Sequence, residues 1–389
     1  MRRVIPVIYA VIFLDALLQF ALVPLLPDYV RQLGLTKTQS GLIVGVYSAM
    51  VLLAALPVGH LADRVGPRRL TIAGTALLAV STAAYGLADG FWRLALARAG
   101  QGISSAISWT AGLAWLAGAA APGRRATLLG SSMAVGSTGA LLGPVVGGPL
   151  GQALGIRAPF ILFAAVAAVL AVWSALPPEA RGAVAEPVSP GRLVRMSAAS
   201  RLLSAGVLVM VVVATVSGAL ETLVPLHLGA DGWSATSISV ALGVAGTVGV
   251  IANLIAARAY AQYGGVAIGL VALFASAVAA VLLVPASFPA LAVAAIYVAA
   301  APAISAQYAV SFPLAADGAE QAGLPNGAVL GMMNVCWGVG FTVGPAAGAA
   351  IAERSSDGVS YALCAVVSLA AMPLLRALAL PAHECQEGA

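Results

Sequence analysis

Long apolar runs alternate with short polar breaks along almost the whole chain. Each run is close to the roughly 20 apolar residues that an α-helix needs to cross a lipid bilayer. The pattern therefore predicts an all-α membrane protein with twelve transmembrane helices. The predicted spans are 5–27, 38–62, 70–88, 94–120, 127–150, 157–176, 201–226, 235–258, 262–284, 288–315, 325–350 and 358–380.

The longest polar stretch lies at the middle of the chain and separates two sets of six spans. It runs from Pro177 to Ser200 and is rich in proline, glutamate and arginine. We predict an N-terminal six-helix bundle at 1–176, a cytoplasmic linker at 177–200, and a C-terminal six-helix bundle with a short tail at 201–389.

The two halves also share an internal repeat. A shift of 201 residues superimposes prolines and glycines of one half on those of the other. The superimposed pairs are Pro24 and Pro225, Gly139 and Gly340, Gly143 and Gly344, Pro144 and Pro345, and Gly147 and Gly348. With six spans per half, both copies enter the membrane from the same side, which predicts parallel repeats related by an axis along the membrane normal.

The composition narrows the class of protein. Hydrophobic residues make up 61% of the 389 residues and charged residues 8%, against roughly 25% charged in an ordinary soluble domain. This excludes a soluble protein. No Ser/His/Asp, zinc or nucleotide motif occurs, and the three histidines are widely separated. The three cysteines have no paired spacing. We therefore expect a protein that is not an enzyme and has no metal, disulfide or cofactor.

The net charge of +5 comes from arginines scattered through short connections. Nucleic-acid binding would need a continuous basic patch, so we expect none. Lys and Arg in short connections are retained in the cytoplasm. A cytoplasmic N-terminus places thirteen on that side: Arg2, Arg3, Arg64, Arg68, Arg69, Arg124, Arg125, Arg181, Arg192, Arg195, Arg201, Arg258 and Arg376. The opposite side then holds five: Arg31, Lys37, Arg93, Arg157 and Arg354.

This asymmetry predicts that both termini and the central linker lie in the cytoplasm, which requires an even number of spans. We expect a multi-pass protein of the plasma (inner) membrane. The first residues, Met1-Arg2-Arg3 and an apolar run, resemble a signal peptide. No small-residue cleavage site follows, so we expect a retained first helix.

Ionisable residues inside a span are costly, by about 2.5–3.5 kcal/mol on insertion scales, and are candidates for function. Asp15 lies in the middle of the first span, with Gln19 on the same helix face. Glu221 lies in the seventh span, and Arg98 in the fourth. Burial favours a protonated carboxyl group and a bound cation favours the ionised form, so a proton and a cationic substrate can compete for one carboxylate. The alternatives are carboxylates near a helix end and an arginine that extends its charged group to the membrane interface.

Two glycine-rich stretches favour a role in conformational change. We expect a tight loop after the second span, Gly59-His60-Leu61-Ala62-Asp63-Arg64-Val65-Gly66-Pro67-Arg68-Arg69. Asp63, which lies among arginines, is expected to form charge-assisted contacts and to sense a neighbouring helix end. In the fifth span, Gly139, Gly143 and Gly147 are four residues apart and permit close helix packing, while Pro144 permits bending. Gly344 and Pro345 repeat this pattern in the eleventh span.

These stretches resemble the major facilitator superfamily, whose signature G-x-L-x-D-R-x-G-R/K-R/K matches the loop after the second span, with Pro67 inserted. Ala97-Arg98-Ala99-Gly100-Gln101-Gly102 resembles the R-x-x-Q-G motif of its fourth helix, and Gly139 to Pro149 resembles the fifth-helix motif of its proton antiporters. The drug and amine antiporter group, which includes vesicular monoamine transporters and bacterial multidrug exporters, is the most similar over nearly the whole chain.

The resemblance implies a substrate site near the membrane midplane between the halves. It implies that Asp15 meets a cationic amine, that Glu221 takes part in recognition or protonation, and that Arg98 takes part in proton transfer. Vesicular monoamine transporters carry acids where this chain has Gln307 and Asn334, and a lysine where it has Tyr47. The gating residues implied by the motifs are Gly59, Asp63, Arg64, Gly66, Arg68, Gly139, Gly143, Pro144, Gly147, Gly344 and Pro345.

Aromatic residues in the spans offer ring faces to a lipophilic cation. They are Tyr47, Trp109, Trp115, Tyr297, Tyr308, Phe312 and Trp337, and the alternative is a place in the core or in an interfacial belt. The expected substrate-binding set is Asp15, Gln19, Tyr47, Trp109, Glu221, Gln307, Tyr308, Asn334 and Trp337.

We expect a monomeric, proton-coupled antiporter that exports small, amphipathic and cationic drugs or amines. Its partners would be the small-molecule substrate, protons and the lipid bilayer. An exporter dedicated to one substrate and a proton symporter for a neutral metabolite remain alternatives. A channel or a non-transporting membrane receptor is the alternative of another class.

Overall fold

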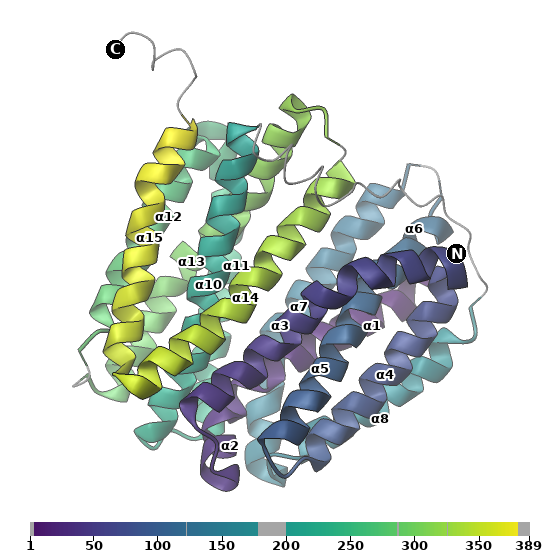
Figure 1. Ribbon diagram of the computed structural model, residues 1–389, viewed down its shortest axis with the longest axis horizontal. Helices are drawn as coiled ribbons and strands as arrows, with labels where there is room; N and C mark the ends of the chain where they lie inside the picture. Colours follow the sequence, from purple (N-terminus) through teal and green to yellow (C-terminus); the bar gives the residue numbers. More distant parts are fainter. Residues whose placement is uncertain (1–3, 122, 178–199, 286–287, 325, 380–389) are drawn as a thin grey trace. The chain divides into compact units, whose positions relative to one another are not determined.

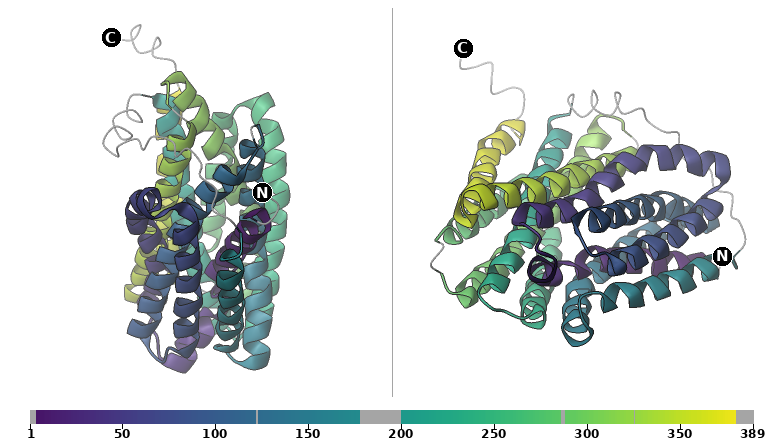
Figure 2. Two further views of the ribbon diagram at one scale, coloured as in Figure 1. Left: turned by 90° about the vertical axis from the view of Figure 1, so that its right-hand side faces the viewer. Right: turned by 60° about the horizontal axis from the view of Figure 1, so that its bottom comes forward.

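The computed structural model describes residues 4–121, 123–177, 200–285, 288–324 and 326–379. These residues form helices and short connections, with no strand among them (Figures 1 and 2). The first half contains α1 (Val4–Ala21), η1 (Val23–Leu25), α2 (Leu26–Leu33), α3 (Lys37–Val65), α4 (Pro67–Leu87), α5 (Phe91–Ile107), η2 (Ser108–Gly112), α6 (Leu113–Ala119), α7 (Arg125–Leu154) and α8 (Ala158–Ser174). The second half contains α10 (Arg201–Ala230), α11 (Ala235–Tyr263), α12 (Gly265–Leu282), α13 (Ala290–Gln321), α14 (Asn326–Arg354) and α15 (Asp357–Ala379).

Each of the twelve predicted spans coincides with a helical segment of the described chain. Ten of these segments are long and apolar enough to cross a membrane, with α1, η1 and α2 taken together as one. The fourth span is divided because η2, a π-helical turn, separates α5 from α6. The sixth span, α8, has 17 residues, which is about 25 Å at 1.5 Å per residue. The all-α membrane fold is thus confirmed.

The connection between α3 and α4 is shorter than the predicted loop. Residues 59–65 belong to α3, and Gly66 alone joins the two helices, with a φ of 95° that favours glycine. Pro67 is the first residue of α4, a position where proline loses no helical hydrogen bond. The expected loop was therefore wrong in extent, and the inserted proline has a structural reason.

The contacts of the chain divide it into two compact units, one with residues 1–184 and 221–243 and the other with residues 185–220 and 244–389. The predicted linker at 177–200 lies almost wholly outside the described residues, and the predicted domain boundaries stay a prediction. Within the first half, α1 packs against α7, α3 against α5, and α4 against α8 (Figure 1).

Corresponding pairs recur in the second half, where α12 packs against α15 and α13. Glycine contacts join α10 to α14, and Gly249 of α11 lies against Ser305 of α13. The two halves therefore use the same pairing of their six spans, as expected of a duplicated six-helix unit.

Glycines spaced four apart bring α7 into contact with the backbone of α1. At Gly139, Gly143 and Gly147 a Cβ atom would overlap a main-chain carbonyl oxygen of α1. The oxygens concerned belong to Phe13, Leu17 and Ala21. In the second half, Gly340 and Gly344 of α14 lie as close to Ala214 and Thr215 of α10. The glycines of both halves thus set the distance between two helices, as predicted.

We predict that Gly143→Ala lowers the midpoint of thermal unfolding of the purified protein, because the added methyl group would overlap the Leu17 carbonyl oxygen. Overpacking of this kind costs about 1–3 kcal/mol. Gly130→Ala is the matched control, because it lies on the same helix and its Cβ would meet no atom within 4 Å. The control should unfold at the same temperature or slightly higher, since alanine favours a helix. Equal loss of stability in both variants would contradict the packing explanation.

Candidate functional site

Asp15 lies in the middle of α1 and is 1% exposed. Its carboxylate accepts three hydrogen bonds: from Ser105 Oγ at 2.7 Å, from Trp109 Nε1 at 3.0 Å, and from Tyr47 OH at 3.3 Å. The alternative position near a helix end is therefore wrong for Asp15. All three donors are neutral side chains, so they orient the carboxylate without compensating its charge.

Local features of the sequence bring these donors together. Ser105 and Trp109 are four residues apart and share one face of the fourth span. Trp109 lies in η2, and π-helical turns of this kind occur frequently at functional sites. Gly102 lets α5 approach α3, since a Cβ atom there would overlap the main-chain oxygen of Tyr47. The glycine of the fourth-span motif is thus required for the close packing of α5 on α3 at the Asp15 site.

Arg98 is also 1% exposed, so it does not extend to the membrane interface. Its guanidinium group donates to Gln101 Oε1 at 3.0 Å and to the main-chain oxygens of Gln19 at 3.3 Å and Ile43 at 3.4 Å. It also lies 4.7 Å from the ring centroid of Tyr47. Tyr47 therefore connects Arg98 to Asp15 through its ring face and its hydroxyl.

The structure gives no ion pair between Arg98 and Asp15 among the residues that it describes. Gln101, the partner of Arg98, donates in turn to Thr82 Oγ1 at 3.0 Å. Gln19, one turn after Asp15, has a buried side-chain Nε2 without a hydrogen-bond partner in this part of the chain. Leaving a buried donor unpaired costs about 1–3 kcal/mol, so Gln19 is a candidate donor for a ligand.

Glu221 has a different environment. It is half-buried on α10, and its Oε2 has no hydrogen-bond partner within the described ranges. Pro225, four residues later, lacks the N–H that would bond the Glu221 main-chain oxygen. The 201-residue offset aligns Asp15 with Val216, so Glu221 lies five residues further along its helix, about 7.5 Å by helical rise. No described hydrogen bond or ion pair joins the two carboxylates.

The predicted residues of the second half lie in two groups. Gln307 is 1% exposed and donates through Nε2 to Ser276 Oγ at 3.0 Å. Its Oε1 has no partner among the described residues. Tyr308 OH lies 2.9 Å from Ser217 Oγ, and Trp337 stacks on a neighbouring phenylalanine at 5.0 Å between ring centroids. Both rings lie beside a methionine-rich cluster that contains Met210 and Met333.

The remaining candidates are dispersed. Asn334 is exposed on α14, and Asp63 and Arg64 are exposed at the end of α3. Tyr297 is half-buried and Phe312 is exposed. Trp115 is fully buried in a core cluster with Ile8 and Ile12, which agrees with the core alternative.

Arg68, one of the arginines near Asp63, contacts a neighbouring helix end; the contact expected for Asp63 itself stays a prediction. Its Nε donates to the main-chain oxygen of Pro177 at 2.7 Å, and its Nη2 to that of Ala175. These carbonyl groups follow the last residue of α8, where basic side chains stabilise a helix end. Arg68 thus holds the end of the sixth span.

Three residues that contact the candidate site side chains were not predicted from the sequence: Ser105, Thr82 and Ser276. Ser105 could have been found, because it lies one turn before Trp109 on the face that meets Asp15. Thr82 and Ser276 lie on neighbouring helices, α4 and α12, and their contacts depend on helix rotation. No signal in the sequence specifies that rotation.

Curated relatives match part of the chain. It is 32% identical over 174 residues to a probable vesicular acetylcholine transporter-B of Danio rerio, a match that covers 42% of this chain and 35% of the relative. It is 30% identical over 171 residues to the quinolone resistance protein NorA of Staphylococcus aureus, covering 44% of each. The chain spans less than half the length of these curated relatives.

Solved structures match nearly the whole fold. A bacterial homologue of the human lysosomal transporter Spinster, in an inward-facing and occupied conformation, aligns with a TM-score of 0.80 at 15% identity and covers 96% of both chains. The nucleoside transporter NupG aligns with a TM-score of 0.77 at 12% identity. At such identities the likeness shows the fold alone. The profile of one family, however, matches residues 8–329. The chain belongs to the Major Facilitator Superfamily.

Proposed function

We propose that the protein is a proton-coupled antiporter that exports small, amphipathic and cationic compounds such as drugs or amines. It would act as a monomer in the plasma (inner) membrane, with both termini in the cytoplasm. The observation that carries this proposal is the buried Asp15 carboxylate, which has three neutral donors and no ion-pair partner in the described part of the chain.

The electrostatics of Asp15 support exchange. A charge in a low-dielectric interior is stabilised by neutralisation, either through a proton or through a bound cation. Both occupants neutralise the same oxygen atoms, so each excludes the other. The nearest described cation, Arg98, is separated from Asp15 by the Tyr47 ring and is held by Gln101 and main-chain oxygens. Asp15 therefore forms no direct salt bridge with Arg98 among the described residues, which leaves its carboxylate available to a substrate.

The relatives support a cationic substrate. One is named for acetylcholine, which carries a quaternary ammonium group, and another for resistance to quinolones. Trp109 and Tyr47 supply aromatic rings beside Asp15, and aromatic rings attract organic cations. The carboxylate charge and the neighbouring aromatic rings together favour an ammonium compound over a neutral metabolite.

Glu221 is the proposed proton carrier. Gln307 and Asn334 are amides and cannot titrate. Among the candidate residues of the second half, this leaves Glu221 of the seventh span as the carboxyl group that can carry a proton. Its unpartnered Oε2 in the described structure leaves it free to accept a proton. In this arrangement Asp15 holds the substrate, and protonation of Glu221 is coupled to the change between inward-open and outward-open states.

We predict that a permanently charged cation, tetraphenylphosphonium, binds the purified protein more weakly as the pH falls. Protonation of Asp15 removes the charge that attracts the cation, so affinity should fall by up to about tenfold per pH unit. Asp15→Asn should weaken binding by about tenfold to a hundredfold and abolish the pH dependence.

The matched control is Asp89→Asn, which removes an exposed carboxylate paired with Arg93 and should change neither property. Equilibrium binding and the unfolding midpoint would be measured for each variant. Normal, pH-dependent binding by a folded Asp15→Asn protein would exclude Asp15 as the substrate carboxylate.

We predict that Glu221→Gln retains cation binding and exchange of labelled for unlabelled cation, but loses export driven by a pH gradient. Glutamine mimics the protonated carboxyl group and cannot release a proton. Both activities would be measured in one preparation of proteoliposomes, with the exposed Glu320→Gln as the control. Loss of binding would make Glu221 a substrate ligand. Intact proton-driven export would place the coupling at Asp15 or Arg98.

A further inference from the structure

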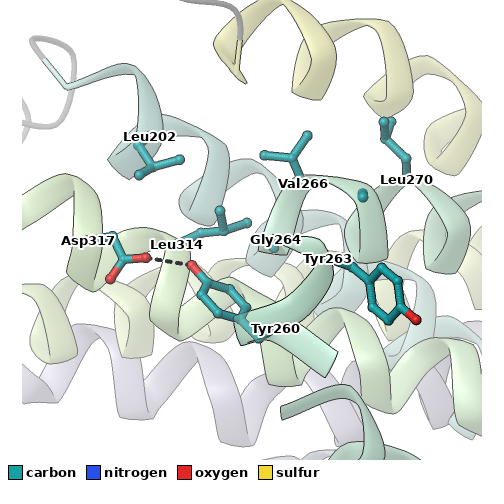
Figure 3. A pocket seen from close by; sticks show the side chains of 10 residues that line it. Leu202, Tyr260, Tyr263, Gly264, Val266, Leu270, Leu314 and Asp317 are labelled. Atoms are coloured by element: carbon teal, nitrogen blue, oxygen red, sulfur yellow. Dashed lines mark hydrogen bonds between the residues drawn. The ribbon is translucent and has the colours of Figure 1, made fainter. Parts of the chain in front are cut away.

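A cavity of about 530 Å³ lies at the end of the second half where α10 begins (Figure 3). It is lined by residues of α10, α11, α12 and α13, all within one compact unit. The residues that carry the argument are Leu202, Tyr260, Tyr263, Leu270, Leu314 and Asp317. This volume is within the range of roughly 300–1,000 Å³ that is typical of small-molecule sites.

The duplicated halves differ in charge at this place. Gly264, with a φ of 76°, joins α11 to α12, just as Gly66 joins α3 to α4. The turn at Gly66 is surrounded in sequence by three arginines, whereas two tyrosines stand before Gly264. The turn at Gly264 therefore has the same positive-φ backbone geometry as the turn at Gly66, but aromatic residues stand beside it in place of basic ones.

The cavity has aromatic and apolar walls and one charged residue. Tyr260 OH donates to Asp317 Oδ2 at 2.7 Å, which fixes the tyrosine ring along the cavity (Figure 3). Gly265 allows this arrangement, because a Cβ atom there would overlap the Tyr260 ring. Leu314 is buried and lines the same cavity.

Among the residues that the structure describes, Asp317 is the only charged one that lines the cavity. Its side chain is exposed, and it forms no ion pair among the described residues. An unneutralised carboxylate beside aromatic and aliphatic walls has the features that attract an ammonium group with an apolar body. Anions are disfavoured by the same charge, and a fully apolar molecule would gain nothing from it.

We propose that this cavity binds an amphipathic organic cation, with its ammonium group at Asp317 and its apolar body against Tyr260, Tyr263 and Leu270. The site is separate from Asp15 and requires no transport. The ammonium group has two possible sources, a free amphipathic amine or the headgroup of an aminophospholipid such as phosphatidylethanolamine.

The test uses 4-phenylbutyltrimethylammonium as the probe and the protein in nanodiscs of phosphatidylglycerol, which contains no ammonium group. All variants carry Asp15→Asn and Glu221→Gln, so that binding at the carboxylates of the proposed transport site is removed. The probe should then bind to one remaining class of site, the cavity. Asp317→Asn should lower the affinity of this site for the probe by about fivefold, the scale of a single exposed ion pair. Glu320→Gln is the matched control, an exposed acid on the same helix outside the cavity.

Tyr260→Phe keeps the carboxylate and the ring and removes only the hydroxyl that fixes the ring, so it should weaken probe binding by less than Asp317→Asn does. The neutral analogue in which carbon replaces the quaternary nitrogen should bind more weakly than the probe. Equal binding by the Asp317 and Glu320 variants, or equal binding of probe and neutral analogue, would overturn the proposal. Because the background already lacks Asp15 and Glu221, failure of the proposed antiport would leave this result unaffected.

Phosphatidylethanolamine added to the discs distinguishes the two sources. The parent protein here carries Asp15→Asn and Glu221→Gln and retains Asp317. If phosphatidylethanolamine weakens probe binding to this parent but not to its Asp317→Asn variant, the lipid headgroup occupies the site. If it has no effect in either protein, the occupant is a free amphipathic cation.

Discussion

The burial of a carboxyl group in the middle of a membrane-spanning helix is the constraint on which the first half depends. Asp15 is buried inside the first half, where an unsatisfied charge is costly. Its three hydrogen bonds come from α3, α5 and the π-helical turn. Gly102 brings α5, which carries Ser105, against α3, which carries Tyr47. The polar contacts of Asp15 and the close packing of α3 and α5 therefore depend on each other.

Duplication has preserved the scaffold and changed the chemistry. Glycines on the fifth and eleventh spans contact the first and seventh in the same manner. In the second half, however, no carboxylate occupies the position of Asp15, and the buried Gln307 donates to Ser276 and to main-chain oxygens. A ring of acceptors suits an amide donor and would disfavour a carboxylate. The two halves therefore offer different partners to a ligand.

The fold could be predicted from the sequence because hydrophobic length and glycine spacing act locally along each helix. Asp15, Glu221 and Arg98 could be found because charge is rare in these spans. Ser105, Thr82 and the contact of Arg68 with the end of α8 depend on the rotation of one helix against another. Serine and threonine also occur throughout membrane helices as local donors to their own backbone. Their type alone therefore does not distinguish a site from a helix surface.

The π-helical turn at Ser108–Gly112 has a consequence for the fourth span as a whole. A π turn holds one residue more than an α turn, so the faces before and after it are out of phase. Arg98 and Ser105 lie before the π turn on the helix face that carries the polar contacts. Trp115 lies after the turn, on a face that packs in the hydrophobic core. One continuous α-helix with this sequence would align only one of the two sets. The extra residue thus allows one span to place side chains both in the polar site around Asp15 and in the hydrophobic core.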